Sequence, residues 1–154
     1  MLLGFYFLED YMIRTYKPKH KFNISKLLKF FKDIEPEEED HYFEVEGLCR
    51  QFFYNENMQD IREHIFDRLP MHISKSKLTL GFLICTGSIL NHRDNLSSTS
   101  FIIPIRIHKD NYFVEDFRDK CLQVGMIYSF NDYLSHGLYV PNSRCITYLV
   151  HISF

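Results

Sequence analysis

The sequence contains no tryptophan, and only six glycines and five prolines occur among its 154 residues. No run of apolar residues approaches the ~18 that a membrane-spanning helix needs, so we expect no transmembrane segment. Neither sign of charge dominates, because 18 basic side chains stand against 20 acidic ones and the net charge is −2. A general binder of nucleic-acid backbones usually carries a basic excess, and we therefore expect no such activity.

The four cysteines, Cys49, Cys85, Cys121 and Cys145, include no Cys-x-x-C pair. Because they are spread through apolar segments, we interpret them as small buried side chains in a reducing compartment. The apolar start of the chain lacks a basic segment and soon reaches Glu9, which is not the pattern of a signal peptide. We therefore expect a soluble, cytoplasmic protein.

Aromatic residues are the abundant class, with 15 phenylalanines and ten tyrosines. These side chains must supply most of the bulky packing in the absence of tryptophan. The length fits one domain with a single core. We divide this domain, residues 1–154, into a mixed, partly helical support region (1–76) and a β-rich region (77–154).

Apolar residues recur at helical spacing twice in the support region. One stripe predicts a helix from about Asn23 to Ile34, and a second predicts a helix over Asn55–Leu69. Residues 1–16 are expected to begin a strand, and the alternation at Tyr42–Gly47 predicts another short one. His64 lies beside the second helical stripe, and we interpret it as a packed or surface histidine rather than a ligand.

From Lys77 onward the pattern changes to six or seven short β-rich segments separated by turn residues. Pro104 interrupts one of them, and because proline has no N–H to donate, that strand should be an edge strand, bulged or broken. The last two segments, around Leu138–Val140 and Arg144–Phe154, are expected to form a hairpin. Helices followed by strands predict an α+β fold, with supporting helices on a double-stranded β-helix, a cupin-like jelly roll.

Four residues of the β-rich region have the chemistry of a metal and anion site. His92 and Asp94 are spaced i, i+2, so an extended strand would project both from one face. His136 lies far enough along the chain to return on another strand. Two imidazoles and one carboxylate form the ligand set of non-haem Fe(II) oxygenases. Arg144 follows, and its guanidinium is suited to gripping a carboxylate with two parallel hydrogen bonds.

This ordered set, H-x-D, a distal His and then an Arg, resembles the Fe(II)/2-oxoglutarate-dependent dioxygenases. Two flanking segments, F-I-I-P-I and G-M-I-Y-S-F-N-D-Y-L-S-H-G-L-Y-V-P-N-S-R-C, strengthen the likeness. They are similar to the distal half of the aspartyl/asparaginyl β-hydroxylase and proline cis-hydroxylase branch. The resemblance covers roughly residues 77–154 and does not extend to residues 1–70.

The resemblance implies that His92, Asp94 and His136 hold Fe(II) and that Arg144 binds the distal carboxylate of the co-substrate 2-oxoglutarate. The implied reaction couples decarboxylation of 2-oxoglutarate to succinate and CO2 with hydroxylation of a C–H bond, and ascorbate is a candidate reductant. A hydroxyl group often assists the arginine, and three residues stay open for this role: Ser100, Ser129 and Thr147.

One departure from the family leaves the substrate open. Members of the aspartyl/asparaginyl branch often use only two histidines and place basic groups shortly after the first. Here Thr99–Pro104 contains no basic pair, whereas Asp94 completes a triad, as in the proline hydroxylases. A free amino acid and a protein side chain therefore both remain candidate substrates, and the sequence does not fix the oligomeric state.

Three other interpretations remain. The same ligands would suit zinc, since imidazole binds several metals, and the chain would then be a metal-binding, cupin-like protein without oxygenase activity. A second interpretation is a non-catalytic jelly-roll module that holds a peptide or sugar in its pocket or on Tyr112–Phe113. A third is a compact relative whose N-terminal half serves a partner rather than the substrate. His108 and His151 are interpreted as structural.

Overall fold

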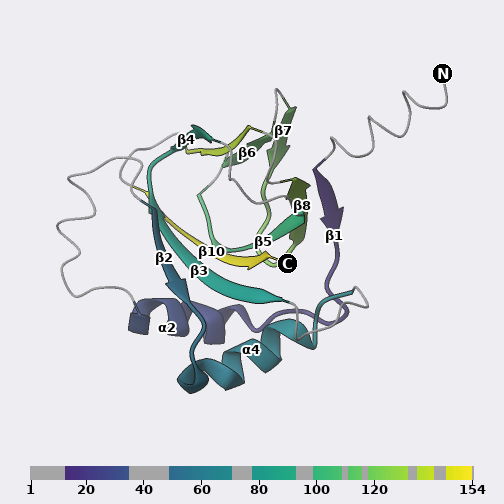
Figure 1. Cartoon of the computed structure of the whole chain (residues 1–154), viewed down its shortest axis with the longest axis vertical. Coiled ribbons are helices and arrows are strands. Elements are labelled where there is room, and N and C mark those ends of the chain that lie inside the picture. Colours follow the sequence, from purple (N-terminus) through teal and green to yellow (C-terminus); the bar gives the residue numbers. More distant parts are fainter. Residues whose placement is uncertain are drawn as a thin grey trace.

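The computed structural model describes residues 13–34, 49–70, 78–92, 99–108, 111–115, 118–131, 135–140 and 145–153 (Figure 1). The helical elements are α2 (Ile24–Ile34), a 3₁₀ turn η1 (Glu56–Met58) and α4 (Gln59–Phe66). The strands are β1 (Arg14–Tyr16), β2 (Cys49–Phe53), β3 (Thr79–Thr86), β4 (Ile89–His92), β5 (Thr99–Arg106), β6 (Tyr112–Glu115), β7 (Arg118–Cys121), β8 (Ile127–Asn131), β9 (His136–Tyr139) and β10 (Ile146–Ser153). The strand expected at Tyr42–Gly47 lies outside the described residues.

The strands form two antiparallel sheets. The large sheet has the order β1-β8-β5-β10-β3-β2 and the small sheet the order β4-β9-β6-β7. From β3 to β10 the chain crosses between the sheets at every step except β6 to β7, which pair as neighbours. This is the eight-strand pattern of a jelly roll. The predicted α+β class with a jelly-roll core is therefore confirmed.

The expected hairpin between the last two strands is wrong. Strand β9 pairs with β4 and β6 in the small sheet, whereas β10 lies between β3 and β5 at the centre of the large sheet. The physical reason is burial, because β10 carries the run Ile146–Val150, all five residues of which are buried. Only a central strand covered on both faces keeps such a run out of water.

The large sheet separates two cores. Alternate residues of β3, β5 and β10 face the helices, and the residues between them face the small sheet. On the helix side the buried strand residues include Leu80, Phe82, Ile84, Phe101, Ile103, Ile105, Tyr148, Val150 and Ile152. Between the sheets lie Ile102, Phe113, Leu122, Tyr128, Phe130, Leu138, Val140 and Leu149.

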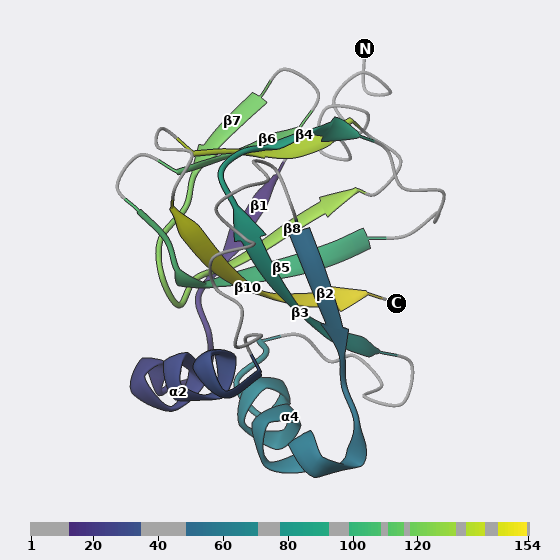
Figure 2. The same cartoon turned by 90° about the vertical axis from the view of Figure 1, so that its left-hand side faces the viewer.

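Helices α2 and α4 cover the outer face of the large sheet, opposite the small sheet (Figure 2). Asn23 caps α2, since its Oδ1 accepts a hydrogen bond from the Lys26 N–H at 3.1 Å. The apolar stripe of α2 buries Leu27 and Phe31, and the Phe31 ring stacks on Tyr148 with centroids 4.9 Å apart. In the described part of the chain, neither helix has the length and apolar character to cross a bilayer.

The two helices are joined to each other by polar contacts at one end. The Asn23 N–H donates to Nε2 of His64 at 3.1 Å, and Lys26 pairs with Asp60 at 2.8 Å. Arg68 donates to the carbonyl oxygens of Lys21 and His64. The interpretation of His64 as a packed histidine is therefore confirmed.

Two special residues shape the strands that carry the candidate site. Gly87 has φ 60° in the turn between β3 and β4, where the chain passes from the large to the small sheet, and this conformation favours glycine. Pro104 lies in the central strand β5. Pro104 pairs with Leu149 and Arg106 pairs with Tyr148, so β5 has one extra residue, Ile105, between two neighbouring pairs with β10. Of the alternatives predicted for the Pro104 strand, the bulge is the one observed.

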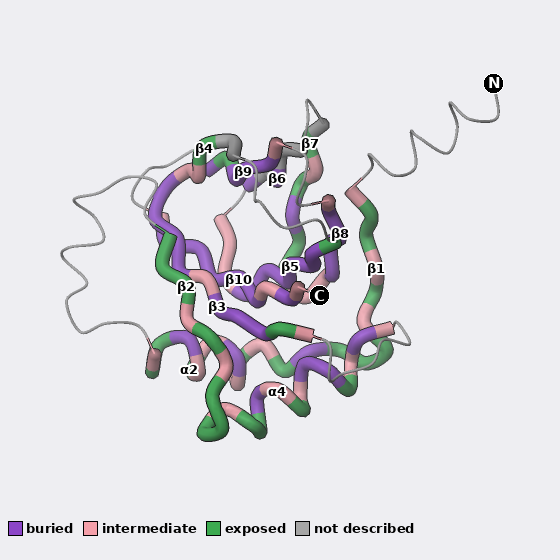
Figure 3. The backbone as a smooth tube through the Cα atoms, viewed as in Figure 1, coloured by how far each residue is buried: buried purple, intermediate pink, exposed green. Residues whose placement is uncertain are grey.

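Strand β2 was not predicted from the sequence. It forms one edge of the large sheet, pairing only with β3 among the described strands, and four of its five residues are exposed (Figure 3). Such a strand lacks the strict apolar alternation by which strands are recognised. Its pairing depends on β3 rather than on its own pattern.

We predict that Phe31→Ala lowers the free energy of unfolding by about 3–5 kcal/mol, because it opens a cavity beneath the stacked Tyr148 ring. Denaturant unfolding followed by circular dichroism measures this. Phe53→Ala is the matched control, since Phe53 is 62% exposed and its truncation should change stability by less than about 0.5 kcal/mol. Equal losses in the two variants would contradict the packing described for α2.

We also predict that acid weakens the helix pair through His64. Burial and the nearby Arg68 and Lys26 charges lower the pKa of His64 from its usual 6.5. The unfolded chain then binds the proton more readily, so this stabilisation is present above about pH 6.5 and is lost as the pH falls. His64→Gln keeps an acceptor without titrating, so its free energy of unfolding should depend less on pH below 6.5.

The control for His64 is His20→Gln, which removes an exposed histidine from the segment before α2. Stability is measured by urea unfolding at several pH values between about 5 and 7.5. If the free energy of unfolding falls by the same amount in His64→Gln and in the unmodified protein as the pH is lowered over this range, protonation of His64 does not weaken the contact between the helices.

Candidate metal and ligand site

A cavity of about 270 Å³ lies between the two sheets. Its walls come from both sheets and are mostly apolar, with histidine and cysteine as the reactive side chains. The lining residues are Cys49, Gln51, Leu83, Cys85, Ile89, Ile102, Phe113, Phe130, His136, Gly137, Leu138, Leu149 and His151. A largely apolar cavity with a few polar groups is the usual form of a small-molecule site.

His136 is the predicted site residue that the structure describes in full. It begins β9, is only 4% exposed and lines the cavity. Its ring lies 4.8 Å from the Phe130 ring and 6.0 Å from the Phe113 ring, centroid to centroid. These two aromatic side chains restrict the orientation of the imidazole and exclude water from part of its surface.

The backbone brings His92 directly opposite His136. The two residues are partners in the antiparallel pair of β4 and β9, and Ile89 is the partner of Leu138. Three steps along β4 therefore match two steps along β9, which is a bulge. Direct partners in an antiparallel pair have Cα atoms about 4.5–5.5 Å apart and share one face of the sheet.

The other predicted site residues fall outside the described part of the chain. These are Asp94, just after β4, and Arg144, two residues before β10 begins; the side chain of His92 is likewise not described. Among the described residues, no group of three or more His, Cys, Asp or Glu side chains is placed to hold a metal ion. That finding does not bear on the triad, which stays a prediction.

The three candidate hydroxyl groups divide between the faces of the large sheet. Ser129 is the cross-strand partner of Phe101, which packs on the helix side, so Ser129 shares the face away from the cavity. Ser100 is opposite Phe130 and Thr147 is opposite Cys85, both of which line the cavity. The register therefore favours Ser100 or Thr147 over Ser129.

The turn that leads into β4 is fixed to β9 by one side chain. The Ser88 hydroxyl donates to the Val140 carbonyl oxygen at 3.1 Å, and it accepts a hydrogen bond from the Val140 N–H at 2.8 Å. Because His92 and His136 lie at the other ends of these two strands, this pair of hydrogen bonds holds the register on which their alignment depends.

Two titratable residues near His136 were missed by sequence reasoning. His151 of β10, interpreted as structural, is half-buried and lines the same cavity. Glu115 of β6 is the cross-strand partner of His136 on the side away from His92. Neither lies in a recognisable motif: His151 is identified by the cavity lining and Glu115 by the strand register.

No protein-family model matches the chain, and no curated protein matches it in sequence. Among solved structures it is similar to a cupin 2 domain-containing protein from Halorhodospira halophila, with TM-score 0.49, 11% identity and coverage of 92% of this chain and 77% of that one. A cupin 2 conserved barrel domain protein from Salinispora arenicola has TM-score 0.47, 8% identity and coverage of 79% and 87%.

A mutant salicylate 1,2-dioxygenase from Pseudoaminobacter salicylatoxidans is similar with TM-score 0.46 and 10% identity, and the match covers 84% of this chain but 31% of that one. Likenesses of this size carry no conclusion about metal content or activity. The jelly-roll assignment rests on the strand order given above.

We predict that cysteines placed at positions 92 and 136 cross-link. The double variant His92→Cys/His136→Cys should form an intramolecular disulfide under mild oxidation, because directly paired strand residues have Cα separations within the 4.4–6.8 Å that a disulfide spans. Peptide mapping by mass spectrometry identifies which cysteines are joined. In the control, His92→Cys/Leu138→Cys, the pair is displaced by two residues, and equal cross-linking there would contradict the register.

Proposed function

We propose that this protein is an Fe(II)- and 2-oxoglutarate-dependent oxygenase that hydroxylates an amino acid or a protein side chain. His92, Asp94 and His136 would hold the metal, and Arg144 would bind the distal carboxylate of 2-oxoglutarate. The observation that carries the proposal is the direct pairing of His92 with His136 beside an interior cavity of a jelly roll.

The donor set fits a divalent cation. Two imidazole nitrogens and one carboxylate oxygen suit iron and leave coordination positions for other ligands. Asp94 follows His92 by two residues, so continuation of β4 in an extended form would keep both on one face. Its negative charge would partly offset the dication, which matters because most of the surrounding cavity wall is apolar.

The aromatic packing supports a positioning role for the protein. Metal-binding histidines need a fixed ring orientation, and the Phe113 and Phe130 rings restrict His136. When bound, the iron would supply the oxygen chemistry, and the chain would supply orientation and a dry pocket. The cavity of about 270 Å³ is below the usual range for drug-sized ligands, which favours a small dicarboxylate at this position.

Arg144 is proposed for the carboxylate because of its chemistry and its place in the chain. It immediately precedes Cys145 and β10, the strand that also contributes Leu149 and His151 to the cavity wall. A guanidinium grips a carboxylate through two parallel hydrogen bonds, which a lysine cannot reproduce. Thr147 or Ser100 would assist from the cavity face of the large sheet.

A second candidate is a non-catalytic binding module that uses the same cavity. The observation that favours it is the mostly apolar wall, which would hold a small apolar ligand without any metal. A metal-binding protein without oxygenase activity is the intermediate case. Thermal unfolding separates the three, because a ligand that binds the native state raises the melting temperature.

We predict that the purified protein, given Fe(II), ascorbate and 2-oxoglutarate, produces succinate even without a prime substrate. His136→Ala and Asp94→Ala should each lower this rate by about 100-fold or more, since even residues behind the ligands typically account for 10–100-fold. Arg144→Lys should raise the KM for 2-oxoglutarate by about tenfold or more, the value of a lost charged hydrogen bond. Succinate is quantified by mass spectrometry.

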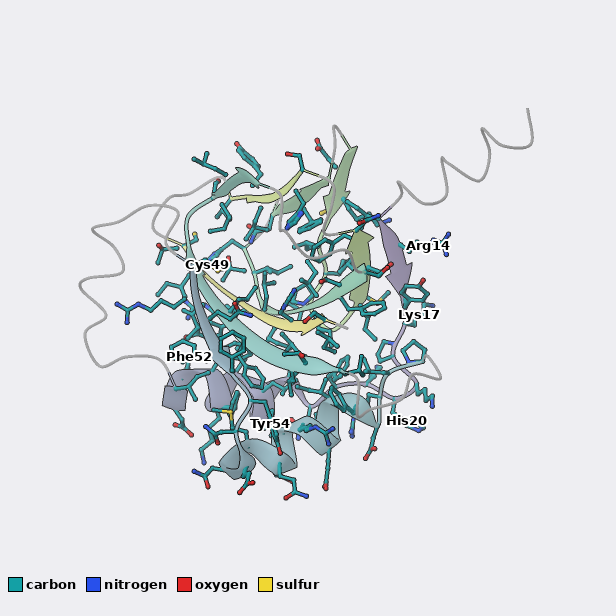
Figure 4. The ribbon with its side chains drawn as sticks, in the orientation of Figure 1. Arg14, Lys17, His20, Cys49, Phe52 and Tyr54 are labelled. Carbon is teal, nitrogen blue, oxygen red and sulfur yellow. The ribbon has the colours of Figure 1, made fainter. Side chains whose placement is uncertain are left out.

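The control is His20→Ala, which removes an exposed histidine on the segment before α2 (Figure 4) and should leave the rate unchanged. A melting temperature that rises with Fe(II) but not with 2-oxoglutarate would indicate a metal protein without this activity. The absence of both responses, together with no succinate, would favour the binding module and contradict the oxygenase.

A further inference from the structure

Two cysteines that are far apart in the sequence meet in the large sheet. Cys49 of β2 and Cys85 of β3 are direct cross-strand partners, and their Sγ atoms lie 2.6 Å apart. Cross-strand partners of either hydrogen-bonding type have Cα separations within the range that a disulfide spans. The two thiols can therefore be joined without moving the strands out of register.

The two thiols differ in their access to solvent. Cys49 lies on the edge strand β2 and is exposed (Figure 4). Cys85 is 1% exposed and lies on β3, which has a strand on either side. Both sulfur-bearing residues line the cavity that contains His136. The expectation that all four cysteines are buried is wrong, since Cys49 and Cys121 are exposed.

The contact between the two thiols also shifts their pKa values in opposite directions. A hydrogen bond from Cys85 lowers the pKa of Cys49, because it stabilises the thiolate on Cys49. The same hydrogen bond and burial raise the pKa of Cys85 well above its usual value. The thiolate is the nucleophilic form of cysteine, so the exposed member of the pair is also the more reactive one.

We propose that Cys49 and Cys85 form a thiol–disulfide exchange site, in which Cys49 attacks a low-molecular-weight disulfide of the glutathione class and Cys85 resolves the product. The proposal is independent of the metal site, because neither cysteine belongs to the predicted metal ligands. The two cysteines that would be reversibly oxidised are part of the cavity wall.

The exchange proceeds in two balanced steps. The Cys49 thiolate forms a bond to one sulfur of the small disulfide, whose S–S bond breaks, and the other half leaves as a thiolate that takes up a proton. Cys85 then loses its proton and attacks the Cys49 sulfur, which releases the second small thiol. Overall the two cysteines lose two electrons and two protons, and the small disulfide gains them.

Oxidation would have a local structural consequence. The new bond would join the edge strand β2 covalently to β3, the only described strand that pairs with it. The same bond would replace two thiol groups in the cavity wall by one disulfide. An excess of small thiol would reverse the reaction.

The test is oxidation of the reduced protein by oxidised glutathione at neutral pH, followed by acid quenching, alkylation of the remaining thiols and peptide mapping. We expect Cys49 and Cys85 to be joined, with a mass loss of two hydrogens, while Cys121 and Cys145 are alkylated. Cys85→Ala should retain glutathione on Cys49, because the resolving thiol is missing. In Cys49→Ser, reaction at Cys85 should slow by about tenfold or more, as expected for a buried thiol.

Cys121→Ser is the matched control, since it removes the other exposed cysteine and should leave the joining of Cys49 to Cys85 unchanged. Modification of Cys121 before Cys49, or full alkylation of Cys49 and Cys85 after oxidation, would overturn the proposal. If the Cys85→Ala variant does not fold, as judged by circular dichroism, the peptide map of the unmodified protein decides the matter alone.

Discussion

Burial of the large sheet on both faces is the constraint on which the rest of this structure depends. Strands β3, β5 and β10 contribute one set of side chains to the helices and the alternate set to the interior. Because the helices take the outward set, including Phe82 and Tyr148, the inward set is free to line a cavity with the small sheet. The support helices thus stabilise the fold without occupying the space in which a ligand would bind.

Strand register determines which reactive groups are neighbours in that cavity. In the small sheet, His136 has His92 as its cross-strand partner on one side and Glu115 on the other. In the large sheet, Cys85 lies in the same way between Cys49 and Thr147. Each set of partners draws on segments that are distant in the sequence. His136, the described member of the candidate metal site, and the Cys49–Cys85 pair therefore line one cavity, so the proposed oxidation of the two cysteines would alter the surroundings of His136.

The sequence predicted those features that depend on local patterns. Helical periodicity located α2 and α4, apolar runs located most strands of the jelly roll, and Pro104 indicated an irregularity in β5, of which a bulge was one of three forms. Strand partners were not predictable in this way, because pairing is decided by burial across the whole sheet. For that reason the final hairpin was wrong, β2 was missed, and neither the Cys49–Cys85 pair nor the position of Glu115 was foreseen. Asp94 and Arg144 remain predictions.

The bulge in β4 has a consequence for how this chain tolerates change in length. Leu90, within the bulged segment, is 85% exposed, and the extra residue there is what places His92 rather than Asn91 opposite His136. Deleting Leu90 or Asn91 would leave two steps on each strand between the Ile89–Leu138 pair and the His92–His136 pair, so the bulge would disappear while His92 kept its partner and its face of the sheet. Homologous chains with the same chemistry could therefore have one residue fewer between Gly87 and His92 without losing the alignment of the two histidines.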